Sequence, residues 1–185
     1  MAAASDESLM LRAGAGDRAA CEELVARHLG RVVTFARRLL GNRADAEDAA
    51  QEVFLRVWAA APRWTAGAAR FTTWLHRVAM NVCLDRAKKH EATPGDLPDL
   101  PDPEAEPSLA LQASDVATHV AAALAALPAT QRTAVTLSVY QEIPHAEAAE
   151  IMSLSVAAFE SLLARGRRAM RARLRPVADA LLRGT

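Results

Sequence analysis

The sequence predicts an all-α protein with two small helical domains joined by an acidic, proline-rich linker. Of its 185 residues, 51% are hydrophobic, and the excess is mostly Ala, Leu and Val, of which Ala and Leu favour helices. Aromatic residues are few, and no run of alternating β-branched residues indicates a strand. Apolar residues instead recur at helical spacing on both sides of one segment rich in proline and acid.

The first domain, residues 1–90, is expected to be a bundle of three or four helices. After a short first helix, Asp17 is a preferred N-cap residue for a long second helix. Gly41 is expected to stop that helix, and Asp45 to cap the next one. The expected helices cover residues 7–13, 17–40, 45–58 and 71–89, with a loop over residues 62–70.

The distribution of charge and proline places the linker at residues 91–113. This segment holds 6 acidic residues and no Lys or Arg, and residues 91–107, which contain five prolines, cannot form a helix or a strand. The flanking blocks are mildly basic, with 14 Lys/Arg against 10 Asp/Glu in residues 1–90 and 8 against 6 in residues 114–185. The formal net charge of zero by itself favours no class of partner.

The second domain, residues 114–185, ends in two helices with helix-turn-helix spacing, separated by a turn at residues 153–155. Small residues begin the outward face of the last helix and arginines follow. This order suits a DNA major groove, because base edges must be approached closely while arginines reach bases or phosphates. An ordinary amphipathic helix with cations near its C-terminus is the alternative. The expected helices cover residues 114–126, 128–140, 145–152 and 156–174, and the last is expected to bury Val156, Phe159, Leu162, Leu163, Gly166 and Met170.

The expected helix over residues 45–58 has an apolar residue on its polar side. At about 100° per residue, Leu55 falls between Asp48 and Gln51, opposite the buried stripe. A lone exposed Leu is often without consequence. An exposed Leu framed by acids is also typical of a helix that docks on a partner protein, so both interpretations stand on the geometry alone.

A polar stripe on the expected helix over residues 71–89 is a candidate for binding single-stranded nucleic acid. Aromatic side chains beside basic and amide side chains suit unpaired bases, because a base can stack and form hydrogen bonds at once. The alternative is a solvated helix face beside aromatic residues that belong to the core. The stripe consists of Thr73, Arg77, Asn81 and Lys88, and the aromatic residues are Trp64, Phe71 and Trp74.

The residues that an enzyme or a metal site would need do not occur at a usual spacing. The sequence has no Gly-rich phosphate loop and no Cys/His metal motif, so we expect no catalytic site, metal or cofactor. Cys21 and Cys83 are too far apart to suggest a disulfide framework and are expected in the core. Nothing resembles a signal peptide or a membrane-spanning run, so we expect a cytoplasmic protein that does not insert into a membrane.

Three motifs in order resemble the bacterial extracytoplasmic-function (ECF) sigma factors, a class of the sigma-70 family, over about residues 17–175. The sequence Asp-Ala-Glu-Asp-x-x-Gln-Glu-x-Phe-Leu-Arg-x-Trp at residues 45–58 is similar to region 2.2 of that family. Residues 71–86 are similar to regions 2.3 and 2.4, and Leu127-Pro-x-x-x-Arg132 with the helix-turn-helix is similar to region 4. The ordered set is far more specific than any one motif.

The resemblance implies a promoter-specificity subunit that is not itself an enzyme, with core RNA polymerase, promoter DNA and an anti-sigma factor as partners. The loop at residues 62–70 would help to melt the minus-10 element and hold a flipped base, and the acidic linker would thread toward the polymerase active site and RNA exit path. By position, the implied contacts to core polymerase are Asp45, Asp48, Gln51, Glu52 and Leu55. The implied minus-10 contacts are Trp64, Thr73, Trp74, Arg77, Asn81 and Lys88, and the implied minus-35 contacts are Ser155, Ala157, Ala158, Glu160, Ser161, Arg165 and Arg168.

The sequence departs from the family pattern at two points in the helix-turn-helix. Ser153 stands where a Gly is usual, which would strain the turn if it requires a left-handed residue. Ala158-Phe159-Glu160 stands where Thr-Val-Lys is common, so a common cation is replaced by a carboxylate. A carboxylate can accept a hydrogen bond from a cytosine amino group, and the minus-35 sequence therefore does not follow from the family.

Two other classes of protein remain as alternatives. A stand-alone helix-turn-helix regulator would bind duplex DNA alone, usually as a dimer, and would not need the acidic face around Leu55. A purely structural helical adaptor would show no salt-dependent affinity for DNA in any state.

Overall fold

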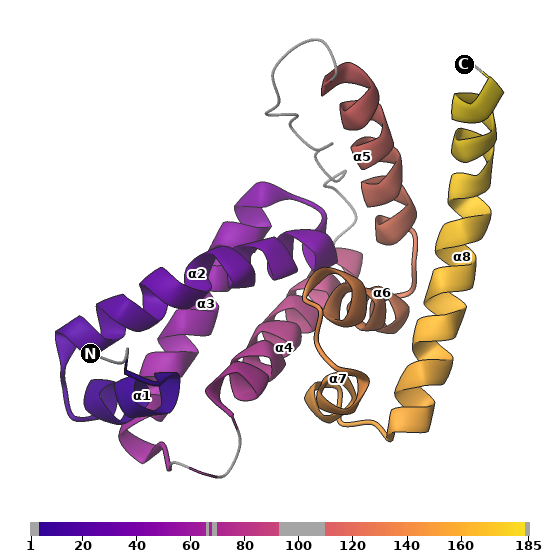
Figure 1. Ribbon diagram of the computed structural model, residues 1–185. Coiled ribbons are helices and arrows are strands. Elements are labelled where there is room, and N and C mark those ends of the chain that lie inside the picture. Colours follow the sequence, from indigo (N-terminus) through magenta and orange to yellow (C-terminus); the bar gives the residue numbers. More distant parts are fainter. Residues whose placement is uncertain (1–3, 66, 68–69, 93–109, 184–185) are drawn as a thin grey trace.

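The computed structural model describes residues 4–65, 67, 70–92 and 110–183, and this part of the chain contains helices and no strand (Figure 1). The all-α prediction is confirmed. The helices are α1 (Asp6–Gly14), α2 (Arg18–Leu40), α3 (Arg43–Ala60), α4 (Phe71–Ala92), α5 (Ala110–Ala125), α6 (Ala129–Val135), α7 (His145–Ile151) and α8 (Val156–Arg183). A short 3-10 helix, η1 (Ala61–Arg63), follows α3, and a π-helical segment, η2 (Thr136–Tyr140), follows α6.

Helix caps in the first half follow local sequence, with one correction. The Asp17 carboxylate accepts hydrogen bonds from the amides of two residues in the first turn of α2, and Gly41 ends that helix in the left-handed conformation at φ 86°. The predicted cap at Asp45 is wrong, because α3 begins earlier and Asn42 is its N-cap. The Asn42 Oδ1 atom accepts from the Asp45 amide at 2.7 Å, and Asn is as good an N-cap as Asp.

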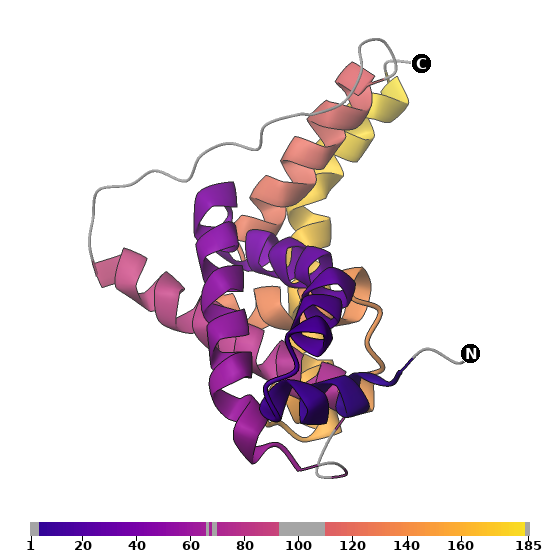
Figure 2. The same ribbon diagram turned by 90° about the vertical axis from the view of Figure 1, so that its left-hand side faces the viewer.

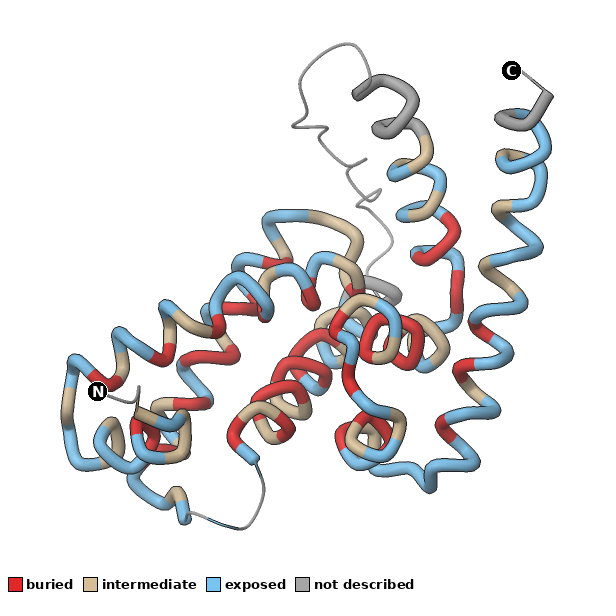
Figure 3. The backbone as a smooth tube through the Cα atoms, in the orientation of Figure 1, coloured by how far each residue is buried: buried red, intermediate tan, exposed pale blue. Residues whose placement is uncertain are grey.

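The core of the first half lies between α2, α3 and α4, with α1 across one end (Figures 1 and 3). Phe35, Val57 and Phe71 are fully buried there. The Asp6 carboxylate of α1 binds two α2 side chains, Arg27 at 2.9 Å and His28 at 2.8 Å, which anchors α1 to the bundle.

In the second half, α8 is longer than expected. It continues through Pro176 to Arg183 rather than ending near residue 174. Pro176 is exposed, so the carbonyl that loses its helical hydrogen bond can be hydrated. Val156, the first residue of the helix, was expected to be buried but is 44% exposed. Helices α5 and α8 run side by side away from the rest of the molecule (Figures 1 and 2).

The two halves of the chain pack against each other. Helix α4 contacts α7, and α2 contacts α5, α6 and η2. Residues 91–92 and 110–113, expected in the extended linker, belong to α4 and α5. The first proline of the segment follows residues 91–92, and Ala110-Leu-Gln-Ala consists of good helix formers, so neither stretch opposes a helix. The rest of the expected linker, residues 93–109, lies outside the described residues.

Candidate functional site

Helix α3 presents an acidic face with one apolar residue at its centre. Asp48, Gln51 and Leu55 are exposed, and the Leu55 side chain has 67% of its surface accessible. The predicted exposure of Leu55 is therefore confirmed. Asp45 and Glu52 are half-buried at the edge of the same face.

Two arginines hold the carboxylate of Glu52 in place on this face. Arg56, one turn along α3, lies 2.6 Å from it, and Arg86 of α4 lies 3.2 Å from it. Arg86 also approaches Asp48 at 4.0 Å. Burial by itself would raise the pKa of Glu52, but hydrogen bonds from Arg56 and Arg86 outweigh it and hold the pKa below its usual range. Glu52 therefore keeps its negative charge at neutral pH, and Arg86 of α4 fixes its position.

An aromatic cluster joins the 62–70 loop to the start of α4. The ring of Trp64 packs edge-on against Trp74, with centroids 5.1 Å apart, and against Phe71 at 6.0 Å. Phe71 is fully buried, whereas Trp64 and Trp74 are half-buried. The Glu7 carboxylate of α1 accepts a hydrogen bond from the Phe71 amide at 3.1 Å and so satisfies a free donor at the start of α4. Neither Glu7 nor its role could be found in the spacing of the sequence.

The polar stripe of α4 is only partly open to solvent. Asn81 and Lys88 are exposed, as predicted for a surface stripe. Thr73 is 3% exposed, and its hydroxyl donates a hydrogen bond to the Glu147 carboxylate of α7 at 2.6 Å. Thr73, which the spacing places in the polar stripe, is therefore covered by α7 and does not face solvent. Arg77 is half-buried and donates to the backbone carbonyl of Glu150 at 2.8 Å.

The helix-turn-helix turn has the geometry expected when a Gly position is filled by Ser. Ser153 has φ 54°, in the left-handed region. Its amide donates to the carbonyl of Glu150 at 3.1 Å, and the Leu154 amide donates to that of Ala149 at 2.9 Å, which together form a Schellman motif. The Ser155 hydroxyl then accepts from the Ala158 amide at 3.2 Å and caps α8.

The face of α8 expected to read DNA is open along its whole length. All of its predicted minus-35 residues are exposed, namely Ser155, Ala157, Ala158, Glu160, Ser161, Arg165 and Arg168. Phe159, Leu163 and Gly166 are buried on the opposite side, as expected from their spacing. Gly166 permits a close crossing with α6, since a Cβ atom there would lie 2.8 Å from the Val135 side chain.

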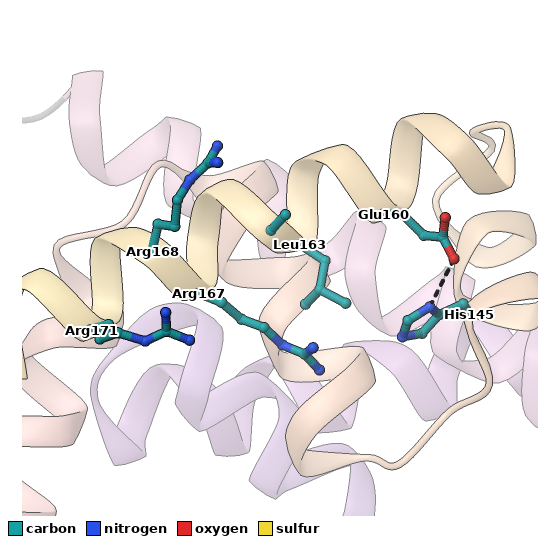
Figure 4. A pocket seen from close by; sticks show the side chains of 7 residues that line it. His145, Glu160, Leu163, Arg167, Arg168 and Arg171 are labelled. Carbon is teal, nitrogen blue, oxygen red and sulfur yellow. Dashed lines mark hydrogen bonds and ion pairs between the residues drawn. The ribbon is translucent and has the colours of Figure 1, made fainter.

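A shallow basic pocket lies along one edge of α8 (Figure 4). Arg167, Arg168 and Arg171 line it, and at its other end the Nδ1 atom of His145 lies 3.2 Å from the Glu160 carboxylate. Sequence reasoning missed Arg167 and Arg171, although Arg171 lies three residues after Arg168 and four after Arg167, a spacing that brings helical side chains together on one side. The Glu160 carboxylate of α8 is thus in contact with a side chain of α7.

The described residues include no cluster of His, Cys, Asp or Glu suited to a metal ion. Among the helices that the structure describes, none is both long enough and apolar enough to cross a membrane. Burial raises the pKa of the Cys83 thiol to about 12, so this cysteine is a core residue rather than a nucleophile.

Comparison with known sequences agrees with this architecture. The sequence profile of sigma-70 region 2 matches residues 24–93, and that of sigma-70 region 4 matches residues 119–170. The chain is 34% identical over 165 residues to the ECF RNA polymerase sigma factor SigM of Mycobacterium tuberculosis, covering 88% of this chain and 81% of SigM. The chain therefore belongs to the sigma-70 family and, within it, to the ECF sigma factors.

Two further comparisons describe the extent of the likeness. The ECF RNA polymerase sigma factor SigE of Mycolicibacterium smegmatis is 34% identical over 164 residues, and the match covers 84% of this chain but 63% of the length of SigE. Among solved structures, the sigma factor RpoE in complex with the anti-sigma factor NepR from Bartonella quintana has a TM-score of 0.67 at 20% identity, over 83% of this chain and 96% of RpoE. This likeness concerns the fold.

Proposed function

We propose that this protein is a promoter-specificity subunit that binds core RNA polymerase and directs transcription initiation at a specific set of promoters. One observation carries the proposal. The α3 face presents an exposed Leu55 among carboxylates held by arginines, an arrangement that supports a docking surface over a lone exposed Leu. A stand-alone DNA-binding regulator has no use for this surface.

Asp45, Asp48, Gln51, Glu52 and Leu55 would contact core polymerase. Leu55 would fill an apolar pocket, and the carboxylates would pair with basic residues around its rim. The half-buried edge positions of Asp45 and Glu52 make them supporting residues, whereas Asp48, Gln51 and Leu55 are directly available.

Promoter DNA would be bound by two separate surfaces. The Trp64–Trp74 cluster and the α4 residues Thr73, Arg77, Asn81 and Lys88 would hold the separated minus-10 strand, by stacking and by hydrogen bonds. The exposed face of α8 would enter the major groove at the minus-35 element. Arg165 and Arg168 would reach bases or phosphates, and Glu160 would accept a hydrogen bond from a cytosine amino group.

The two surfaces would belong to two domains, residues 1–90 and 114–185, with residues 91–113 as the linker. We also propose regulation by an anti-sigma factor, on the analogy of the RpoE complex with NepR. The protein would act in the cytoplasm and have no enzymatic activity of its own.

Asp48→Arg tests the docking surface. The substitution reverses a charge beside Leu55 and places a second cation near Arg86, so affinity for core RNA polymerase should fall about tenfold or more. Glu47→Arg is the matched control, because Glu47 is exposed on the same helix but outside the proposed contacts. Circular dichroism should be unchanged in both variants.

Equal binding of Asp48→Arg and Glu47→Arg in a pull-down with core polymerase would contradict the docking claim. If the protein were instead a dimer that footprints duplex DNA without polymerase, the stand-alone regulator would be the better account.

A further inference from the structure

His145, the first residue of α7, and Glu160 of α8 form a contact between the two helices of the helix-turn-helix. The Nδ1 atom of His145 lies 3.2 Å from one carboxylate oxygen of Glu160, Oε1. Figure 4 shows this oxygen turned toward the imidazole and the second carboxylate oxygen turned away from it. The second oxygen, Oε2, accepts no hydrogen bond from the described residues. The contact therefore fixes one half of the carboxylate and leaves the other half available.

The imidazole of His145 is held by packing as well as by hydrogen bonds. Its ring lies against the ring of Phe159, with centroids 5.6 Å apart, and Phe159 is fully buried. The Nε2 atom of His145 is 3.5 Å from the Ser138 hydroxyl, and Arg167 donates to the same hydroxyl at 3.4 Å. Ser138 belongs to η2, and π-helical turns of this kind are rare and frequently lie at functional sites. Side chains from η2, α7 and α8 therefore meet at this ring.

The direction of each hydrogen bond in this chain of contacts follows from the groups themselves. An ionised carboxylate only accepts, so the Nδ1 atom of His145 must carry a proton in order to donate to Glu160. A neutral imidazole then has an acceptor at Nε2, so the Ser138 hydroxyl donates to it. The Ser138 oxygen in turn accepts from Arg167, which can only donate. The neutral ring of His145 is therefore fixed as the tautomer with its proton on Nδ1.

The position of the Glu160 carboxylate matters because a carboxylate must be aimed to distinguish one base from another. In the major groove, cytosine offers its amino group, whereas adenine places the acceptor N7 beside its amino group. A carboxylate with one oxygen bound to His145 would accept from the cytosine amino group through its other oxygen, and the N7 atom of adenine would repel it. Ordering a free side chain of this length at an interface costs about two- to tenfold in affinity. His145 removes part of that cost before DNA binds.

The partner of Glu160 is an imidazole although three arginines line the same pocket. Figure 4 shows Glu160 and His145 at one end of the pocket and Arg168 and Arg171 at the other. Within the described part of the chain, Glu160 forms no ion pair with an arginine. Arg168 and Arg171 therefore stay available for phosphates, while Glu160 stays available for a base.

We propose that His145 is a positioning residue that sets the specificity of α8 for one base pair of the minus-35 element, by aiming the Glu160 carboxylate at a cytosine amino group. This proposal rests on the assignment of the α8 face to minus-35 recognition made above. His145 reads no base itself and acts through Glu160, while Ser138 supports the tautomer that donates to the carboxylate.

The tautomer of His145 tests the proposal without polymerase or promoter. Long-range ¹H–¹⁵N correlation spectra of the full chain at about pH 8.5 show which nitrogen of each neutral imidazole carries the proton. The His145 signal is assigned by its loss in His145→Asn. An imidazole in water prefers the proton on Nε2, so a proton on Nδ1 is the signature of the Glu160 contact, and Glu160→Ala should move it to Nε2. A proton on Nε2 in the wild-type protein would overturn the proposal.

A promoter library randomised across the minus-35 element measures base preference in transcription. The full chain is combined with core RNA polymerase, and sequencing of the transcribed templates gives the preference at each base pair. Glu160→Ala should lose the preference for a C:G pair at one position, which identifies the base that Glu160 reads. His145→Ala should reduce the preference at this same position about two- to tenfold and leave the preference at the other positions unchanged.

Two conservative variants separate positioning from a general structural role. In His145→Asn, the side-chain amide can donate from the place of Nδ1, because both nitrogens are bonded to the Cγ atom. In His145→Gln, the amide lies one bond further out, near the place of Nε2. His145→Asn should therefore keep the preference for cytosine, whereas His145→Gln should lose it as far as His145→Ala does.

An unchanged preference in His145→Ala, or an equal loss in His145→Asn and His145→Gln, would overturn the proposal. It would also be overturned if Glu160→Ala changed the preference at no position. Failure of the proposed function is a different result, in which the wild-type protein gives no promoter-specific start sites on the library even though His145 carries its proton on Nδ1.

Discussion

Replacement of Ser153 by Gly should stabilise the helix-turn-helix. Ser153 has φ 54° in a Schellman motif whose two amide–carbonyl hydrogen bonds, 3.1 and 2.9 Å long, are already formed. A left-handed conformation costs an L-residue about 1–2 kcal/mol. Gly avoids this cost but loses about 0.5–1 kcal/mol of extra backbone entropy on folding. With the middle of each range, the net expectation is a gain of about 0.75 kcal/mol.

The measurement is urea unfolding of the full chain, followed by circular dichroism. With a slope of about 2 kcal/mol/M, the gain corresponds to a rise of roughly 0.4 M in the unfolding midpoint. Ser155→Ala, two residues along, is the matched control. It removes the hydroxyl that caps α8 and should cost about 1 kcal/mol.

The two variants should therefore shift stability in opposite directions. A lower midpoint for Ser153→Gly would refute the reasoning, because it would mean that the left-handed residue carries no strain. A rise for Ser155→Ala would refute the assignment of the cap.

Three further predictions follow from buried positions. Gly166→Ala should destabilise the second half by about 1–3 kcal/mol, because the new Cβ atom would lie 2.8 Å from the Val135 side chain. Thermal unfolding measures the loss of stability, and an unchanged midpoint would contradict the close α6–α8 crossing. Cys83 should not react with a maleimide at pH 8 in the native protein but should react in denaturant, since burial raises its pKa to about 12. Cys21, which is partly exposed, is the internal comparison. Rapid labelling of both thiols in the native protein would contradict the burial of Cys83. Burial also lowers the pKa of His76, so the unfolded chain binds a proton at this residue before the folded chain does as the pH falls. The stability that comes from keeping His76 neutral is therefore complete above about pH 6.5 and is lost below it. His76→Asn should flatten the dependence of the unfolding midpoint on pH between pH 7.5 and 5.5.

Sequence reasoning predicted features that depend on one helix alone. The 3.6-residue period placed Leu55 on the exposed side of α3 and a face of small residues and arginines on the exposed side of α8, because both faces follow from spacing within one element. The expected strain at Ser153 was also correct, since it depends only on the turn.

Features that depend on a second element could not be predicted in this way. Thr73 belongs to the polar side of its own helix by spacing, but α7, more than 70 residues later, covers it. Glu7 binds the first amide of α4 from across the bundle, and no local pattern encodes that contact. The N-cap of α3 was missed for a different reason, because Asn42 and Asp45 are equally good caps and only the backbone decides between them.

Run-off transcription with purified core RNA polymerase on a genomic promoter library tests the central claim most directly. The account predicts discrete start sites that appear only when this protein is added, that share minus-10 and minus-35 sequences, and that are lost with Asp48→Arg but not with Glu47→Arg. The absence of new start sites, together with binding of the protein alone to duplex DNA, would contradict the account.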